Sequence, residues 1–356
     1  MRPPSRREII ALWLLSVVLF VVVVSHFQQY ALKVDNFADN GAYLDAARAI
    51  HDWNFKGVIV KQFWGLSYVV ALLSFLPAVS LRVGLLLTCG ACSLISVLLA
   101  DRLWGAWIAS YFAVLNFDWM QRSYLGGSEP LFVALLFAAF LCTRKERWIW
   151  AAILAALASV VRPIGVFGLL AVGLVLLFRR DYRKFLICTG AGAVVGALYL
   201  VPFWLYLNDA LYQVHRYQTS DWHSGRVLDL PFKALVFSFV HNREPLSNVL
   251  LTLGWIVFVL VGFAAMSRRG YRSEIGDRMP EFLFAFSYLA FLLTYNSEWA
   301  RAEFPRFAIP LVPFVLSALE PWVPKSRPAL YTVCVIGSVL AACSAIGIRN
   351  VLAVLR

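Results

Sequence analysis

Acidic side chains gather in one short stretch that follows the first apolar segment of the chain. The stretch NFADNGAYLDAARAIHDW, residues 36–53, carries Asp39, Asp45 and Asp52. A carboxylate can take the proton from a hydroxyl group as that group attacks an electrophile, so these residues are candidates for a general base. The alternative is a solvated loop without a catalytic role. A base beside a membrane span would act on a substrate held in the lipid.

Two further charged residues stand at the edges of later apolar segments. The first is Glu129, which begins the segment EPLFVALLFAAFLCTR. From Glu129 to Arg144 at the end of this segment is about 15 residues, or roughly 22 Å of helix. Because a hydrocarbon core is about 30 Å thick, we expect Glu129 below the outer surface of the membrane. Arg162, in VVRPIG, is placed similarly. Such charges are costly unless they pair or line a wet cavity, so a structural ion pair is the alternative to a functional role.

A late cluster of charges could contact an anionic substrate. The segment NSEWARAEFPRFAIP, residues 296–310, places Arg301 and Arg306 at the mouth of two apolar segments. Arginine binds phosphate bidentately, although either residue could instead pair with Glu298 or Glu303. The segment 208–245 contributes further polar residues, among them two histidines that form only a weak signal for a metal site. We interpret that segment as a lid or an acceptor surface.

The composition indicates the class of protein to which these residues belong. The chain has 356 residues, of which 61% are hydrophobic and 15% charged, and its mean hydropathy is +0.73. A soluble protein needs more polar surface than this. Apolar runs separated by short charged clusters are typical of a polytopic helical membrane protein. The net charge of +12 then belongs to cytoplasmic loops, and no nucleic-acid partner is expected.

The segment 63–79 decides the topology. If it crossed the membrane, the basic clusters 143–147, 179–184 and 267–278 would all lie outside, against the positive-inside rule. We therefore expect this segment to lie in the outer interface or to dip in and return. The N-terminus is then cytoplasmic and the C-terminus external, with about eleven spans. The expected spans are 8–27, 82–100, 104–120, 129–142, 147–161, 164–178, 185–207, 246–266, 281–295, 306–320 and 329–348.

The predicted fold is therefore an all-α polytopic transmembrane protein whose first external loop carries a juxtamembrane helix. That helix is expected over residues 42–50, with Asn40 as its cap and Asp39 in the preceding turn. The chain 1–356 is interpreted as a single membrane domain. Its expected parts are an N-terminal module over 1–207, the external loop 208–245, and C-terminal transmembrane helices over 246–356.

The order of these motifs resembles the GT-C superfamily of integral-membrane glycosyltransferases. An early span precedes an acidic external loop, which is followed by RSYLGGSEPLF, ASVVRPIGVFGLLAVGLVLLF and a late EFPRFAIPLVP. The likeness is to the bacterial protein-mannosyltransferase and aminoarabinose-transferase-like branch, and to GPI-type mannosyltransferases. It covers roughly residues 8–207 together with the late arginine motif, and the order and topology of the motifs carry it.

The resemblance implies a substrate and roles for individual residues. The donor would be a polyprenyl-phosphate sugar, and the acceptor a lipid, a glycan or a protein on the extracytoplasmic side of the plasma membrane, where membrane lipids surround the enzyme. The first-loop aspartate acts as base or orients the acceptor, and a basic residue of the RPIG-like segment lines the donor phosphate site. The implied residues are Asp39, Asp35 and Glu129 for catalysis, Arg162, Arg301 and Arg306 for the donor phosphate, and Arg122, Tyr124 and His223 for the substrate cavity.

Two alternatives stay open at this point. The pattern DNFAD departs from the adjacent acidic pair or D-x-D of some members, so the sequence settles neither a divalent metal ion as cofactor nor the choice between Asp35 and Asp39. The competing function is a transporter or flippase of an anionic lipid-linked substrate, which could also use the buried charges Glu129 and Arg162. The sequence shows no inverted repeat of hydropathy, which favours the transferase.

Overall fold

The computed structural model describes residues 2–27, 34–55, 60–220, 227–233, 236–237, 239, 246–268, 275–295 and 303–347. Within these ranges the regular secondary structure is helical, apart from one isolated bridge between Leu228 and Tyr295, so the all-α prediction is confirmed. The chain divides into two compact units. Unit 1 comprises Met1–Phe137 and Leu319–Arg356, and unit 2 comprises Ala138–Ala318.

Several helices are long and apolar enough to cross a membrane, which identifies an integral membrane protein. The part of the chain that the structure describes contains 5 such helices, or up to 6 if the pair α6 (Phe117–Leu125) and α7 (Glu129–Arg144), bent by 107°, forms one broken span. The expected number of about eleven spans is therefore not confirmed. The five are α1 (Arg6–His26), α4 (Leu81–Trp104), α10 (Tyr182–Leu207), α13 (Leu246–Arg268) over Val249–Ser267, and α18 (Arg327–Ile346).

Local breaks explain why some expected spans are shorter than a bilayer. The expected span 104–120 is interrupted at Asn116, where α5 (Ala106–Leu115) ends and α6 begins. The Asn116 side chain accepts a hydrogen bond from the backbone N–H of Trp119 at 2.9 Å, which caps α6. The expected span 306–320 is interrupted because prolines remove backbone donors. It contains α16 (Phe304–Phe307), η5 (Ile309–Leu311) and α17 (Val312–Ala318).

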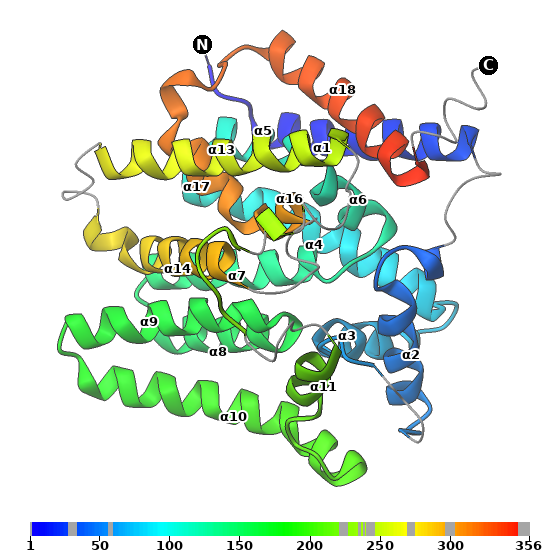
Figure 1. Cartoon of the computed structure of the whole chain (residues 1–356), viewed down its shortest axis with the longest axis vertical. Coiled ribbons are helices and arrows are strands. Elements are labelled where there is room, and N and C mark those ends of the chain that lie inside the picture. Colours follow the sequence, from blue (N-terminus) through cyan, green and yellow to red (C-terminus); the bar gives the residue numbers. More distant parts are fainter. Residues whose placement is uncertain are drawn as a thin grey trace. The chain divides into compact units, whose positions relative to one another are not determined.

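Unit 1 holds the acidic stretch between short helices and a long one. The predicted juxtamembrane helix is confirmed as α2 (Asn40–His51), which packs against α3 (Gly65–Ser74) and α4. Tyr43, Leu66 and Leu85 meet in the apolar core of these three helices. In the same unit α18 lies along α1 (Figure 1). The helix α3, within the segment 63–79, has 10 residues and is about 15 Å long, which is shorter than a hydrocarbon core of about 30 Å. That the segment does not cross the membrane stays a prediction.

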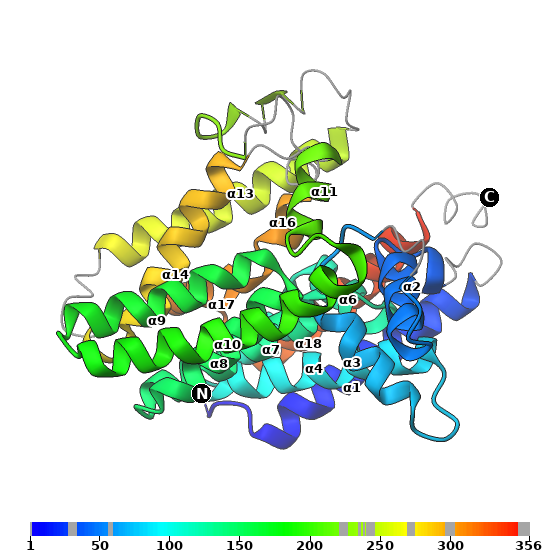
Figure 2. The same ribbon diagram turned by 90° about the horizontal axis from the view of Figure 1, so that it is seen from below.

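Unit 2 is built from helices that stack beside one another. The helices α8 (Trp148–Val161), α9 (Val166–Phe178) and α10 pack together, as Figures 1 and 2 show. The helix α14 (Ile275–Thr294) packs against α9, and α13 packs against α17 and α16. The remaining described elements of the chain are η1 (Val34–Asn36), η2 (Pro163–Gly165), α11 (Tyr212–Ser220) and η6 (Glu320–Trp322).

A buried ion pair joins the last turn of α7 to α14 within unit 2. Arg144 donates from Nε to Glu281 Oε1 at 2.6 Å and from Nη2 to Oε2 at 2.7 Å. The Glu281 side chain is 2% exposed. Removing one partner of such a pair leaves a buried charge without compensation, which costs about 3–5 kcal/mol.

We expect Glu281→Gln to lower the thermal unfolding temperature of the detergent-solubilised protein, because the Arg144 guanidinium loses its counter-charge. The matched control is Glu8→Gln, since Glu8 also accepts two hydrogen bonds from one arginine, Arg327, but on the surface. Exposed pairs contribute little, so the control should unfold near the native temperature. Equal losses in both variants would contradict a special role for the buried pair.

Candidate active site

Contacts within unit 1 bring the acidic stretch to the segment that joins α6 to α7. The guanidinium carbon of Arg122 lies 4.9 Å from the centre of the Phe37 ring. The Tyr43 hydroxyl donates to Ser128 Oγ at 2.9 Å. Ser128 immediately precedes Glu129, so two segments that are about 85 residues apart form one side of a site. The sequence motifs that carry the predicted base and the predicted acid are therefore neighbours in space.

The two glycines of the GGSE motif make this close approach feasible. A Cβ atom on Gly127 would lie 2.7 Å from both Arg122 Cδ and Glu129 Oε2, so both side chains close over this glycine. Gly126 has a φ of +114°, which side chains other than glycine rarely adopt. Arg122 is 5% exposed and Glu129 is 2% exposed, in agreement with the expected depth of Glu129. The motif thus holds a buried cation and a buried acid beside the same turn.

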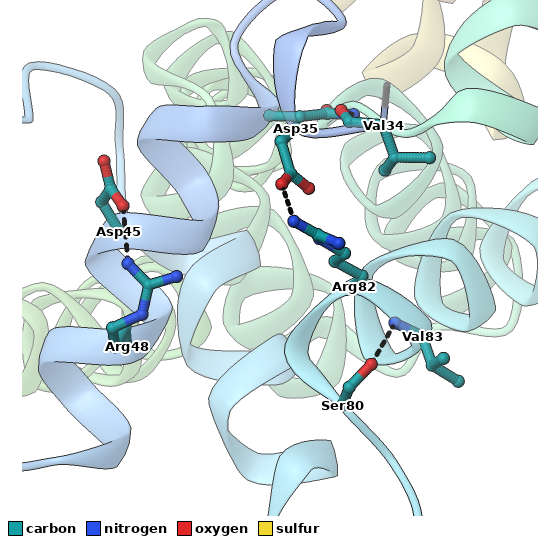
Figure 3. A network of polar contacts seen from close by, with 8 residues as sticks. Val34, Asp35, Asp45, Arg48, Ser80, Arg82 and Val83 are labelled. Carbon is teal, nitrogen blue, oxygen red and sulfur yellow. Dashed lines mark hydrogen bonds and ion pairs between the residues drawn. The ribbon is translucent and has the colours of Figure 1, made fainter. Parts of the chain in front are cut away.

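The two candidate bases have different partners. Asp35 forms an ion pair with Arg82 Nη2, at the start of α4 (Figure 3). Asp39 Oδ1 accepts a hydrogen bond from Gln62 Nε2 at 3.1 Å. Both candidate bases thus have polar partners in the fold, a guanidinium beside Asp35 and an amide beside Asp39. The choice of Asp39 as the base remains a prediction from the sequence.

The position of Asp39 differs from the expected one by a single residue. The helix α2 begins at Asn40, so Asp39 occupies the N-cap position, and its side chain makes no capping hydrogen bond. The prediction that Asn40 caps the helix is wrong, because its side chain is completely buried and bonds to other segments. Asp39 therefore stands at the end of a helix with its carboxylate directed to Gln62 rather than to the helix backbone.

The other aspartates of the stretch lie in solvent. Asp45 pairs with Arg48 at 3.0 Å on the exposed face of α2, and Figure 3 shows this pair apart from Asp35. Asp52 lies 2.9 Å from His51 Nδ1 and is also exposed. These residues match the solvated-loop interpretation. The stretch therefore contains two classes of carboxylate, one buried in part and one exposed.

A separate cluster in unit 2 contains two of the arginines that were predicted to bind phosphate. Arg162 lies in extended backbone between α8 and η2, and it is 9% exposed. Its guanidinium carbon is 5.4 Å from the centre of the Phe307 ring, and that of Arg306 is 5.8 Å from the same ring. Arg306 also donates to Glu303 Oε2, so the alternative of a local ion pair holds for that residue. Two guanidinium groups thus converge on one aromatic side chain.

The RPIG turn explains how Arg162 is held. A Cβ atom on Gly165 would lie 2.4 Å from the backbone nitrogen of Ser159, so only glycine lets η2 fold back onto α8. The backbone N–H of Gly165 donates to the carbonyl of Arg162 at 2.9 Å. This short turn directs Arg162 away from the helix axis toward Phe307. Sequence reasoning identified the arginine but not its aromatic partner.

The structure places one of the remaining predicted site residues, Tyr124, in contact with α1. The Tyr124 hydroxyl donates to Ser16 Oγ at 2.9 Å and its ring packs on Phe20 of α1, which gives Tyr124 a packing role in unit 1. Arg301 and His223 lie outside the described residues. Among the residues that the structure does describe, no group of three or more His, Cys, Asp or Glu side chains could hold a metal ion.

Sequence reasoning missed several residues that complete the site in unit 1. Arg82, Gln62 and Asn40 contact the two candidate bases or the segment that carries them. The only signal for Arg82 was a charge at the start of an apolar segment, where flanking charges are common. Gln62 had no signal at all. Their roles follow from contacts across the fold.

Comparison with solved structures supports the fold. The chain is similar to ArnT from Cupriavidus metallidurans bound to undecaprenyl phosphate, with a TM-score of 0.57 and 15% sequence identity over 93% of this chain and 63% of that chain. The apo form of ArnT from the same organism matches with a TM-score of 0.51 and 15% identity over 93% of this chain and 76% of that chain. The first comparison therefore spans less than two thirds of the length of ArnT. These matches support the GT-C fold.

Comparison by sequence identifies the family. No curated protein matches the chain. The model of glycosyltransferase family 87 matches residues 65–295, which include α3, the GGSE motif and the RPIG turn. That range is well over half of the 356 residues. The chain is an integral-membrane glycosyltransferase, and it belongs to glycosyltransferase family 87.

Proposed function

We propose that this glycosyltransferase moves a sugar from a polyprenyl-phosphate donor to an acceptor on the extracytoplasmic side of the plasma membrane. The observation that carries the proposal is the contact between the Asp35–Asp39 segment and the Arg122–Glu129 segment in unit 1. The similarity in fold to ArnT bound to undecaprenyl phosphate supports a donor of this chemical class. The acceptor is a lipid, a glycan or a protein.

The proposed reaction needs a base and an anion-binding group. Asp39 takes the proton from the acceptor hydroxyl as its oxygen attacks the anomeric carbon of the sugar. The bond between that carbon and the phosphate oxygen breaks, and the polyprenyl phosphate leaves with the bonding electrons. Charge develops on the departing phosphate, and fixed cations stabilise it. From the sequence motifs, we propose Arg162 and Arg306 of unit 2 as the residues that bind the donor phosphate.

Glu129 and Arg122 have a different proposed role. Both side chains are buried beside Gly127. Contacts of Phe37 and Tyr43 bring the segment that carries them to the acidic stretch. A buried acid and a buried cation in one turn can hold an acceptor through charge-assisted hydrogen bonds. We propose that they orient the acceptor hydroxyl relative to the base.

The test is a comparison of glycans made with and without this protein, together with an assay of purified protein in lipid nanodiscs. Mass spectrometry of glycolipids and surface glycans should show the loss of one hexose or pentose when the protein is absent. The purified protein should transfer that sugar from its polyprenyl phosphate to the acceptor so identified. Movement of the intact donor across the membrane without a new glycosidic bond would contradict the proposal and favour the transporter.

A further inference from the structure

The side chain of Asn40 is a completely buried amide that connects two distant segments. Its Nδ2 donates to the carbonyl oxygen of Val34 and to that of Leu125, both at 2.8 Å, and the residue is 0% exposed. Both partners are carbonyl acceptors, so the amide nitrogen and not its oxygen must face them. An amide nitrogen carries two hydrogens, and this arrangement uses both of them.

The absence of a side chain at Gly126 leaves the space that the Asn40 amide occupies. A Cβ atom on Gly126 would lie 2.6 Å from Asn40 Nδ2, a distance that real Cβ atoms essentially never show, and 3.0 Å from its Oδ1, which is a tight contact. Any residue larger than glycine at 126 would therefore displace the amide. Asn40 and Gly126 fit each other across about 86 positions of sequence.

The two segments joined in this way carry the proposed catalytic groups. Val34 immediately precedes Asp35 in η1, and Asn40 itself immediately follows Asp39. Leu125 ends α6, between Arg122 and Glu129. The amide therefore links the segment that carries Asp35 and Asp39 to the segment that carries Arg122 and Glu129.

We infer that Asn40 is a positioning residue that sets the spacing between the first-loop carboxylate and the Arg122–Glu129 pair. This inference rests on the proposed function, because the spacing matters only if both segments act on the substrate. A displacement of about 1 Å of a group that positions or activates substrate can cost about 10²-fold in rate. Asn40 contributes through the residues it holds and carries no charge of its own.

The first variant to test is Asn40→Asp, which keeps the size of the side chain and replaces the donor by a second acceptor oxygen. Both hydrogen bonds are lost, so we expect kcat for transfer to fall about 10²-fold while KM for the donor changes less than about threefold. The matched control is Asn116→Ala, which removes another fully buried asparagine of unit 1 together with its cap on α6. The control should lower the unfolding temperature and keep most of kcat.

The second set of variants keeps the inference testable if Asn40→Asp fails to fold. Gly126→Ala alone should reduce kcat strongly, because the new Cβ pushes against the Asn40 amide. In an Asn40→Ala background the atoms that clash are absent, so Gly126→Ala should cost about tenfold less there than in the native background. Strictly multiplicative losses would overturn the inference, because the two residues would then act independently.

Hydrogen exchange provides a readout that does not depend on transfer. Asn40→Ala should raise amide exchange in peptides that cover 34–43 and in peptides that cover 122–129, because it removes the hydrogen bonds of Asn40 to Val34 and to Leu125. Native kcat in the Asn40 variants together with an inactive Asp39→Asn would overturn this inference and leave the proposed function intact. Absence of sugar transfer by the native protein would overturn the proposed function itself, whereas full activity of an Asp35→Asn and Asp39→Asn double variant would overturn the role of the first-loop carboxylates and with it this inference.

Discussion

Asp39→Asn is expected to insert and fold like the native protein and to lose about 10²-fold or more in kcat for sugar transfer. The substitution preserves the size of the side chain and its capacity to accept a hydrogen bond from Gln62 Nε2, now 3.1 Å from Oδ1. It removes the negative charge and the basicity that proton transfer needs. The rate is measured with the purified protein and its polyprenyl-phosphate sugar, and folding is checked by thermal unfolding.

The control for this experiment is Asp45→Asn, in the same stretch of sequence. Asp45 is 63% exposed and pairs with Arg48 on the outer face of α2, so its neutralisation should leave kcat near the native value. Asp35→Asn tests the second candidate, which pairs with Arg82. Near-native transfer by Asp39→Asn alongside an inactive Asp35→Asn would move the role of base to Asp35. Full activity in both single variants and in the double variant would refute carboxylate catalysis from this loop.

Arg162→Ala should weaken binding of the polyprenyl-phosphate donor by roughly 10- to 10²-fold, because a hydrogen bond to a charged group contributes about 1.5–3 kcal/mol. Binding of the acceptor should change much less. Arg162→Lys should restore only part of the affinity, since an ammonium group cannot form the bidentate contact of a guanidinium. The dissociation constants are measured with the donor in nanodiscs and, separately, with the free acceptor.

The matched control is Arg179→Ala. Arg179 also places its guanidinium carbon over an aromatic ring, 5.2 Å from the centre of Trp148, but at the other end of α9 from Arg162. Loss of this cation should leave donor affinity unchanged. Arg306→Ala should weaken donor binding in the same direction as Arg162→Ala. Unchanged donor affinity in both variants would mean that the arginines serve only to pack on Phe307 and to pair with Glu303.

The class of the protein and much of its framework followed from local properties of the sequence. The long apolar helices α1, α4 and α10 match segments that hydropathy alone identified, because insertion in a membrane depends on the composition of about 20 consecutive residues. The helix α2 also followed from local spacing, and the motifs that contain Asp39, Glu129 and Arg162 pointed to the family. What hydropathy could not reveal was where an apolar run is broken, as at Asn116, because a single capping side chain decides it.

The partners of the candidate residues were decided only by the tertiary structure. Arg82 meets Asp35 across 47 positions, and Asn40 meets Leu125 across 85. Arg162 and Arg306 share the ring of Phe307 although 144 positions separate them in the chain. A sequence motif specifies which side chains are present, but the direction of each depends on how its helix ends and on what packs against it. For this protein the sequence by itself determined which reactive side chains are present. Packing between helices that are remote in the sequence determined which of these side chains lie close together.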